Sequence, residues 1–251
     1  MAFVSTLGFF WQLYVATKYS ADGANWLFPP THLAAHKLMT RGNVIGLVGA
    51  TMLVQLGLAC WFRLALTLLL LPIWGYVWLI SQGFWAHTWL KGQPLVHLLS
   101  QIMVIPFIFF YITACDWLVS GAAPPTGLAW YLIAGFFTGM IFEIGCNIRA
   151  PQDEEAEIET YSQLWGRRTS VTIWLLAIAL TGLSLAFAAE TLRASILLLA
   201  LAFGLLTSAV LIGERFLETP RTLYAASIHK FSALCMVLLY LGLAVMPIFF
   251  A

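Results

Sequence analysis

The densest group of side chains capable of chemistry lies in residues 142–168, which read FEIGCNIRAPQDEEAEIETYSQLWGR and a further Arg. Pro151 should end one apolar helix, and it can open another helix as its first residue. On such a helix Asp153, Glu157 and Tyr161 line one face, because they are spaced four residues apart. Clustered carboxylates provide hard oxygen ligands for Mg²⁺, which in turn can clamp a phosphate or diphosphate.

Three arginines flank this acidic run: Arg149, Arg167 and Arg168. Each can bind the same anion through paired N–H groups. Glu143 and Asn147 share one face at the end of the preceding helix, and with Tyr161 they are candidates for the mouth of a cavity. An acid-rich first turn favoured by the helix dipole explains the carboxylates equally well without a ligand. The spacing alone leaves both interpretations open.

Lys91 is a further candidate anion contact, four residues after His87 in the segment FWAHTWLKGQP. The two side chains would share one face of a helix. The tryptophans around them also fit a turn anchored at a membrane interface, so this segment too has two interpretations.

The elements that position these side chains must lie in a membrane. Of 251 residues, 61% are hydrophobic and only 9% are charged, which is too little charge to cover a water-facing surface. A soluble enzyme and a disordered chain are therefore excluded. The formal net charge of +1 provides no basic field for nucleic acid, which is not expected as a partner.

Eight apolar segments can each span a hydrocarbon core of about 30 Å as a helix. They are residues 3–19, 43–60, 64–82, 97–117, 127–147, 170–189, 194–213 and 228–250. The sequence shows no linker or soluble domain between them. The predicted fold class is an all-α polytopic membrane protein with eight transmembrane helices, forming a single membrane-embedded domain over residues 1–251.

The basic residues predict the orientation of this bundle. Long polar connections alternate with short ones along the chain, and they lie at residues 20–42, 83–96, 148–169 and 214–227. All but two of the twelve Lys and Arg residues fall on the side of the long connections, the exceptions being Arg63 and Arg193. The positive-inside rule then places the long connections in the cytoplasm, across a bacterial-type inner membrane.

Small residues and prolines give two further expectations. Gly42, Gly46 and Gly49 form a stripe of small residues that predicts a close helix contact. Pro72 and Pro106 lie inside apolar runs, where each should free a backbone carbonyl and kink its helix.

The run IRAPQDEEAEIETYSQLWG, residues 148–166, resembles the second acidic motif of the UbiA-type intramembrane prenyltransferases, in the form found in a bacterial branch of that family. The FEIG before it, TACDW at 113–117 and FFWQL at 9–13 resemble further segments of the same family. The resemblance implies a helical bundle around a lipid-open central cavity. It also implies two acidic motifs that hold Mg²⁺ and an isoprenyl diphosphate, with Asp153, Glu154 and Glu155 in the second.

The chain departs from the family at the first acidic motif. Several acids should follow FFWQL, but the sequence reads YVATKYSADGANW, which leaves Asp22 and Asn25 as candidate ligands beside Lys18. A charged lysine cannot coordinate Mg²⁺. The chain also begins at what resembles the family's second helix, so a UbiA-like bundle without the first helix is expected.

Two functions follow from the resemblance. The first is a degenerate family member without catalysis, which acts as a subunit of a membrane complex or binds an isoprenoid lipid, a quinone or a pigment such as a carotenoid. The second is an active Mg²⁺-dependent prenyltransferase, which moves an isoprenyl group from its diphosphate to a membrane-facing acceptor. The reduced first motif favours the first function, because a single acidic cluster leaves much of the diphosphate charge unneutralised.

Overall fold

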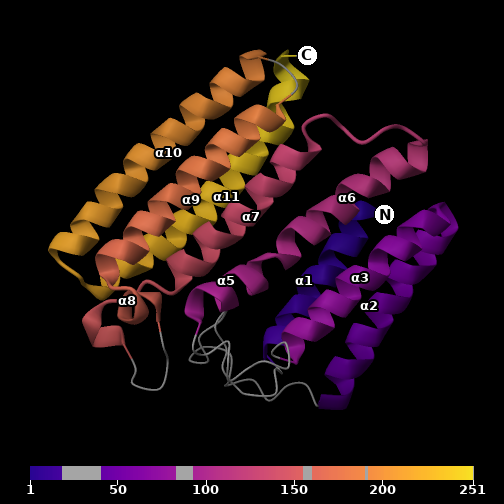
Figure 1. Ribbon diagram of the computed structural model, residues 1–251, viewed down its shortest axis with the longest axis horizontal. Coiled ribbons are helices and arrows are strands. Elements are labelled where there is room, and N and C mark those ends of the chain that lie inside the picture. Colours follow the sequence, from indigo (N-terminus) through magenta and orange to yellow (C-terminus); the bar gives the residue numbers. More distant parts are fainter. Residues whose placement is uncertain (19–40, 83–92, 155–159, 190–191, 251) are drawn as a thin grey trace. The chain divides into compact units, whose positions relative to one another are not determined.

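The computed structural model describes residues 1–18, 41–82, 93–154, 160–189 and 192–250 (Figure 1). Within these ranges every regular element is helical, and seven spans are long and apolar enough to cross a membrane. The first helix, α1 (Ala2–Lys18), is apolar over Ala2–Ala16 but is shorter than these seven spans. The prediction of an all-helical polytopic membrane protein is therefore confirmed, and the eighth span stays a prediction.

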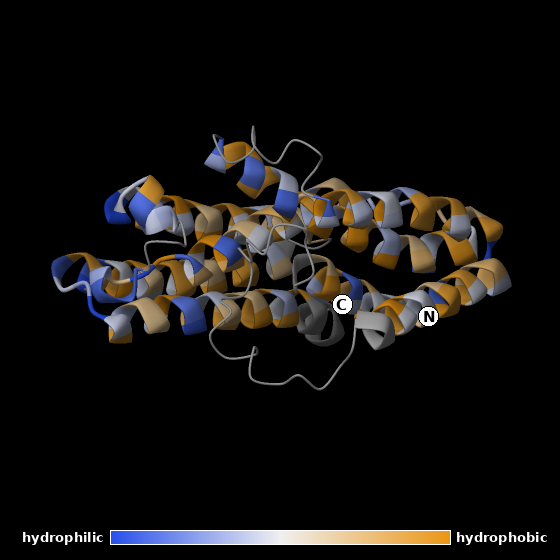
Figure 2. Cartoon of the chain, turned by 90° about the horizontal axis from the view of Figure 1, so that it is seen from below, coloured by the Kyte–Doolittle hydropathy of each residue, from blue (hydrophilic) through white to orange (hydrophobic). Residues whose placement is uncertain are grey.

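The surfaces of these helices match a hydrocarbon environment. Figure 2 shows hydrophobic residues along the lengths of the helices. Large apolar side chains are exposed on several of them, including Leu53, Leu68 and Phe203. Exposed apolar surface of this extent is unfavourable in water but is what a lipid-facing helix requires.

The described helices fall into two compact units, which we call the N-terminal unit (Met1–Pro125) and the C-terminal unit (Thr126–Ala251). The N-terminal unit contains α1, α2 (Arg41–Phe62), α3 (Leu64–Ser81), α5 (Pro94–Ile102) and α6 (Val104–Ser120). Helix α1 packs against α2, α3 and α6, and α3 also packs against α2 and α6. Phe9, Leu66, Leu70 and Tyr111 are fully buried in the core of this unit.

The two prolines inside the spans of this unit behave differently. Pro106 stands in the first turn of α6, and the helix is interrupted three residues earlier, at Met103. The interruption follows from the missing N–H of Pro106, which cannot bond the carbonyl of Ile102. Helix α3, in contrast, continues through Pro72.

The stripe of small residues on α2 does not make the predicted helix contact. In the described structure, a Cβ atom built on Gly46 or Gly49 would meet no atom within 4 Å. This prediction is therefore wrong for these two glycines, because they face open space and not a neighbouring helix. A close approach occurs at Gly8 of α1, where a Cβ atom would lie 2.7 Å from Nε2 of Gln55.

The C-terminal unit contains four long helices and two short ones. They are α7 (Leu128–Cys146), η2 (Pro151–Asp153), α8 (Tyr161–Leu164), α9 (Arg167–Ala188), α10 (Leu192–Glu218) and α11 (Thr222–Phe250). The long helices pack in a closed order, with α7 on α9, α9 on α10, α10 on α11 and α11 on α7. A Cβ atom on Gly182 of α9 would overlap that of Ala202 of α10, so these two backbones lie very close together.

The predicted long connection at 214–227 is wrong. Helix α10 continues to Glu218 and α11 begins at Thr222, so only three residues join them. Glu214, Arg215 and Glu218 are good helix formers, and they extend the helix beyond its apolar part until Pro220 ends it. The α10–α11 link lies at the same end of this unit as η2 and α8 (Figure 1).

Candidate functional site

The structure describes eight of the residues expected at a functional site, and all of them belong to the C-terminal unit: Glu143, Asn147, Arg149, Asp153, Glu154, Tyr161, Arg167 and Arg168. The remaining candidates lie outside the described residues: Asp22, Asn25, Lys91, Glu155 and Glu157. The candidate site can therefore be built from the end of α7, the turn η2, α8 and the start of α9.

The acidic segment begins as a single 3₁₀ turn. Pro151 is its first helical residue, as predicted, and the turn ends at Asp153. The predicted helix that carries both Asp153 and Tyr161 on one face is wrong, because the backbone of Glu154 is extended and Tyr161 begins a separate helix, α8. The carboxylate of Asp153 accepts a hydrogen bond from the hydroxyl of Thr222 at 3.0 Å, and that hydroxyl accepts one from Nε2 of Gln152 at 3.0 Å. These bonds attach the turn to the first residue of α11.

Arg149 also bonds within this segment. Its Nη1 donates to the backbone carbonyl of Asp153 at 3.4 Å, and its backbone N–H donates to Oγ of Ser162 at 3.1 Å. Next to this turn, Oε1 of Glu154 is buried and has no hydrogen-bond partner in the part of the chain that the structure describes. Asp153 and Glu154 are thus the described carboxylates that could contribute to a Mg²⁺ site.

Glu143 and Asn147 lie on the same face of α7 and touch, as their spacing predicts. Nδ2 of Asn147 donates to Oε1 of Glu143 at 3.1 Å and to its backbone carbonyl at 2.9 Å. Both residues are buried, with 4% and 5% of their surface exposed. The pair therefore satisfies part of its own hydrogen-bonding capacity inside the protein, and its place at the mouth of a cavity stays a prediction.

Helix α8 brings Tyr161 against this pair. Thr160 caps the helix through a capping box with Gln163, and the ring of Tyr161 stacks on Trp165 with centroids 4.6 Å apart. Burial raises the pKa of Tyr161 well above its ordinary value, and the negative charge of Glu143 raises it further. Tyr161 is accordingly a neutral phenol at physiological pH.

Two hydroxyls of this region were not among the expected site residues. Oγ1 of Thr160 and Oγ of Ser162 lie 3.1 Å apart, and Ser162 also receives the backbone N–H of Arg149. Thr160 and Gln163 form the pattern Thr-x-x-Gln, which is a helix-start signal visible in the sequence. That signal could have placed α8, although not the contact with Arg149.

Two of the three predicted anion-binding arginines meet at one pocket. The pocket has a volume of about 560 Å³ and is lined by Ser162, Trp165, Gly166, Arg167, Arg168, Thr169 and Leu217. It lies at the N-terminus of α9, where unpaired backbone N–H groups favour an anion. Nε of Arg167 is buried there without a hydrogen-bond partner among the described residues. Arg149 does not line this pocket.

No metal centre is formed by the described carboxylates alone. Within the described ranges, no three His, Cys, Asp or Glu side chains are grouped closely enough to hold a metal ion. Asp153 and Glu154 would need ligands from residues 155–159 or from a second acidic segment. Mg²⁺ binding therefore stays a prediction.

The N-terminal unit holds a polar group that the sequence interpretation overlooked. Gln12, Gln55 and Trp74 come from three different helices and form hydrogen bonds to one another in the interior of the unit. An amide side chain inside a membrane-spanning helix requires a partner. Two glutamines in otherwise apolar runs were the available signal for this network.

Comparisons with known proteins do not assign the chain to a family. No protein-family model matches the chain, and neither a curated protein nor a solved structure matches it. The UbiA-type interpretation therefore rests on the motif resemblance in the sequence.

Proposed function

We propose that this chain is a UbiA-like integral membrane protein that does not transfer prenyl groups. It works as a subunit of a membrane complex, or it holds an isoprenoid lipid, a quinone or a pigment. The observation that carries the proposal is the hydrogen bond of 3.0 Å between the Asp153 carboxylate and Thr222. Asp153, the first acid of the motif, thereby attaches the segment that follows α7 to the first residue of α11.

The acidic segment uses oxygen atoms of Asp153 in hydrogen bonds within the protein. A diphosphate carries several negative charges, and its departure requires metal ions held by two groups of oxygen ligands. Here one oxygen of Asp153 is bonded to Thr222, and its backbone carbonyl faces Arg149. The other acidic segment retains only Asp22 and Asn25. A structural role for Asp153 explains why the chain has acids at the second motif although few stand at the place of the first.

The second candidate function is Mg²⁺-dependent prenyl transfer. Its support is the buried and unpartnered Oε1 of Glu154, together with the two arginines at the start of α9. In this reaction the bond between the allylic carbon and the diphosphate oxygen breaks, and the acceptor bonds to that carbon and loses a proton. Mg²⁺ would neutralise the leaving diphosphate.

The proposed location is a bacterial-type inner membrane with the long connections in the cytoplasm. The distribution of basic residues supports it: within the C-terminal unit, Arg149, Arg167, Arg168 and Arg221 accompany η2, α8 and the α10–α11 link. Arg193 stands near the start of α10, at the opposite end of that helix.

The test separates a structural Asp153 from a metal ligand. The full chain is purified in mild detergent and incubated with farnesyl diphosphate, Mg²⁺ and a membrane lipid extract that supplies the acceptor, and released diphosphate is measured for the unaltered protein, Asp153→Asn and Asp153→Ala. Asn keeps an oxygen acceptor for Thr222 but loses the charge that binds Mg²⁺. We expect no Mg²⁺-dependent turnover in any of the three proteins, and loss of thermal stability only in Asp153→Ala.

Turnover by the unaltered protein that needs Mg²⁺ and disappears in both variants would overturn the proposal and establish the prenyltransferase. The subunit role is tested separately by native electrophoresis of gently solubilised membranes. We expect the chain to migrate in a complex larger than itself, and migration as a single chain would contradict this role.

A further inference from the structure

Helix α9 exposes a single narrow line of side chains. After its first turn, every described residue of α9 is buried or partly buried except five, which we call the α9 stripe: Thr172, Leu176, Leu180, Leu183 and Phe187. Their spacing of three or four residues places them on one side of the helix. The hydroxyl of Thr172 donates to the backbone carbonyl of Arg168 at 2.9 Å, so it does not need a partner outside the helix. The α9 stripe is therefore an apolar surface.

The α9 stripe leads into the pocket at the start of the same helix. Thr169 is exposed, lines that pocket and lies three residues before Thr172, on the same side of α9. Arg167 begins one membrane-spanning segment, and Leu217 of α10 lies one residue before the end of another. Both residues line the pocket, so it lies at the level where lipid head groups meet the hydrocarbon core.

The pocket is basic. Arg168 is exposed and Arg167 is partly exposed, and both side chains line it. No Asp or Glu of the described residues lines it, and Asp153 and Glu154 lie outside it. A diphosphate held by Mg²⁺ requires carboxylates beside it, whereas the phosphate of a phospholipid requires only cations. The described lining therefore fits a phosphodiester better than a metal-bound diphosphate.

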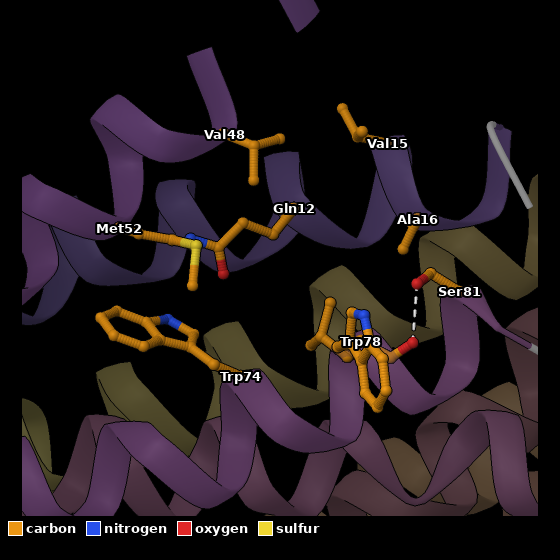
Figure 3. Close-up of a pocket in the computed structure, with 9 residues that line it drawn as sticks. Gln12, Val15, Ala16, Val48, Met52, Trp74, Trp78 and Ser81 are labelled. Carbon is orange, nitrogen blue, oxygen red and sulfur yellow. Dashed lines mark hydrogen bonds between the residues drawn. The ribbon is translucent and has the colours of Figure 1, made fainter. Parts of the chain in front are cut away.

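The pocket of the N-terminal unit has a different chemistry. It lies between α1, α2 and α3, has a volume of about 260 Å³ and is lined mainly by apolar side chains such as Val48 and Met52 (Figure 3). No charged side chain lines it. It therefore contains nothing that would distinguish an anionic lipid from a zwitterionic one.

The length of the α9 stripe matches one leaflet of a bilayer. The hydrocarbon core is about 30 Å thick, so an acyl chain of one leaflet covers about 15 Å. The helix rises about 11 Å from Thr169 to Leu176 and about 17 Å from Thr169 to Leu180. An acyl chain that descends from the pocket would thus lie on Leu176 and Leu180 within its own leaflet.

We infer that this pocket binds the phosphate of an anionic phospholipid through Arg167 and Arg168, while an acyl chain of the same lipid lies along the α9 stripe. Basic pockets beside the ends of membrane-spanning helices bind anionic head groups in this way. A zwitterionic lipid also carries an ammonium group, for which the pocket has no described carboxylate. The inference goes beyond the proposed function, because it holds whether or not the chain transfers prenyl groups.

The test compares two lipids that differ in net charge. The full chain is purified in mild detergent and mixed with equal amounts of dioleoyl phosphatidylglycerol and dioleoyl phosphatidylethanolamine, and native mass spectrometry measures the retained lipids. A basic residue near a membrane surface contributes about fivefold to the affinity for an anionic lipid. We expect roughly a tenfold preference for phosphatidylglycerol, which is less than two arginines could give because the ethanolamine lipid also has a phosphate.

Two pairs of substitutions assign the preference to the pocket. Arg167→Gln with Arg168→Gln removes both charges, and the preference should fall to about twofold or less. Arg215→Gln with Arg221→Gln is the matched control, because it removes two exposed arginines at the same end of the unit that do not line the pocket. This control should keep the preference. Arg168→Gln alone changes an exposed side chain and should reduce the preference by about threefold, which tests the site without the paired substitution.

Soluble anions distinguish a lipid from a free phosphate. Inorganic phosphate, or diphosphate with Mg²⁺, at the concentration of the lipid should not displace phosphatidylglycerol, because neither has an acyl chain for the α9 stripe. Displacement by either anion would overturn the inference. Equal retention of the two lipids, a preference that survives in Arg167→Gln with Arg168→Gln, or its loss in the control pair would overturn it as well.

Discussion

The two units treat their buried polar groups differently. In each unit later helices pack back on the first one: α2, α3 and α6 on α1, and α9 and α11 on α7. In the C-terminal unit the indole N–H of Trp174 donates to Oγ of Ser232, which donates to the carbonyl of Ile228, both at 2.8 Å. In the N-terminal unit the corresponding chain of bonds ends at an oxygen of Gln12 that has no described partner.

Burial differs most between one helix of each unit. Half of the membrane-spanning part of α9 is buried, compared with 11% of that of α2, whereas the spans of α3 and α10 are equally buried, at 28%. At the contact of α9 with α10, close packing leaves little room for a ligand, and the completed bonds of Trp174 and Ser232 leave no group there for a ligand to satisfy. The C-terminal unit nevertheless has a pocket at the start of α9 and unpartnered atoms on Glu154 and Arg167.

The largest expected effect tests the difference in helix packing. Gly182→Leu would force α9 away from Ala202 on α10, and we expect it to lower the free energy of unfolding by about 3 kcal/mol. Gly49→Leu in α2, where a side chain has open space, should change it by less than about 0.5 kcal/mol. Unfolding by SDS in mixed micelles, followed by circular dichroism, measures both. If both substitutions lowered the free energy of unfolding equally, helix packing at these two positions would not differ as the structure indicates.

The next largest effect is expected at Gln55, which bonds to Gln12, Trp74 and the Ser5 carbonyl in the N-terminal unit. Gln55→Leu removes the partners of Trp74, Gln12 and the Ser5 carbonyl together, and we expect a loss of about 2 kcal/mol. Gln12→Leu breaks fewer bonds and also removes an unpaired acceptor, so its cost should stay below about 1 kcal/mol. The same SDS titration compares them. If Gln12→Leu cost as much as Gln55→Leu, Oε1 of Gln12 would have a bonding partner after all.

A smaller effect tests the completed bond chain of the C-terminal unit. Ser232→Ala leaves the indole N–H of Trp174 buried without an acceptor, and we expect a loss of about 1 kcal/mol. Ser227 lies on the same helix, and among the described residues its hydroxyl bonds only to the carbonyl of Leu223 in its own helix. Ser227→Ala should therefore be nearly neutral in a parallel thermal melt, and a cost equal to that of Ser232→Ala would show that the contact with Trp174 adds nothing.

The smallest effect is expected at the acidic turn. Thr222→Val removes the donor to Asp153, and this bond is exposed, so the global loss should be only about 0.5 kcal/mol. Hydrogen exchange of the peptide that contains Pro151 and Asp153 should nevertheless become faster, because the turn is no longer attached to α11. Unchanged exchange would show that Thr222 does not hold the turn.

Much of the fold was predictable because a membrane leaves few alternatives. An apolar run of about twenty residues must satisfy its backbone internally, and a helix is the solution for a single segment. The boundary between α10 and α11 was predicted wrongly because Glu214, Arg215 and Glu218 are polar but helix-forming. Polarity alone therefore did not mark the end of the helix.

The site was predictable only where its contacts are local. The spacing of Glu143 and Asn147 predicted their contact, and Pro151 predicted the start of the turn. The bond between Asp153 and Thr222 joins residues 69 positions apart, and that between Gln12 and Gln55 joins residues 43 positions apart. Such pairings depend on how the helices pack against one another, and the spacing of residues along the sequence does not reveal this packing.

The bond between Trp174 and Ser232 also constrains the biosynthesis of the protein. The two residues are 58 positions apart, and Ser232 lies in α11. At about 5–20 residues per second, the ribosome needs roughly 3–12 s to proceed from one to the other. During that interval α7, α9 and α10 are inserted without α11, and the indole N–H has no acceptor. The hydrogen bond that joins α9 to α11 can therefore form only after Ser232 has been synthesised and α11 has been inserted.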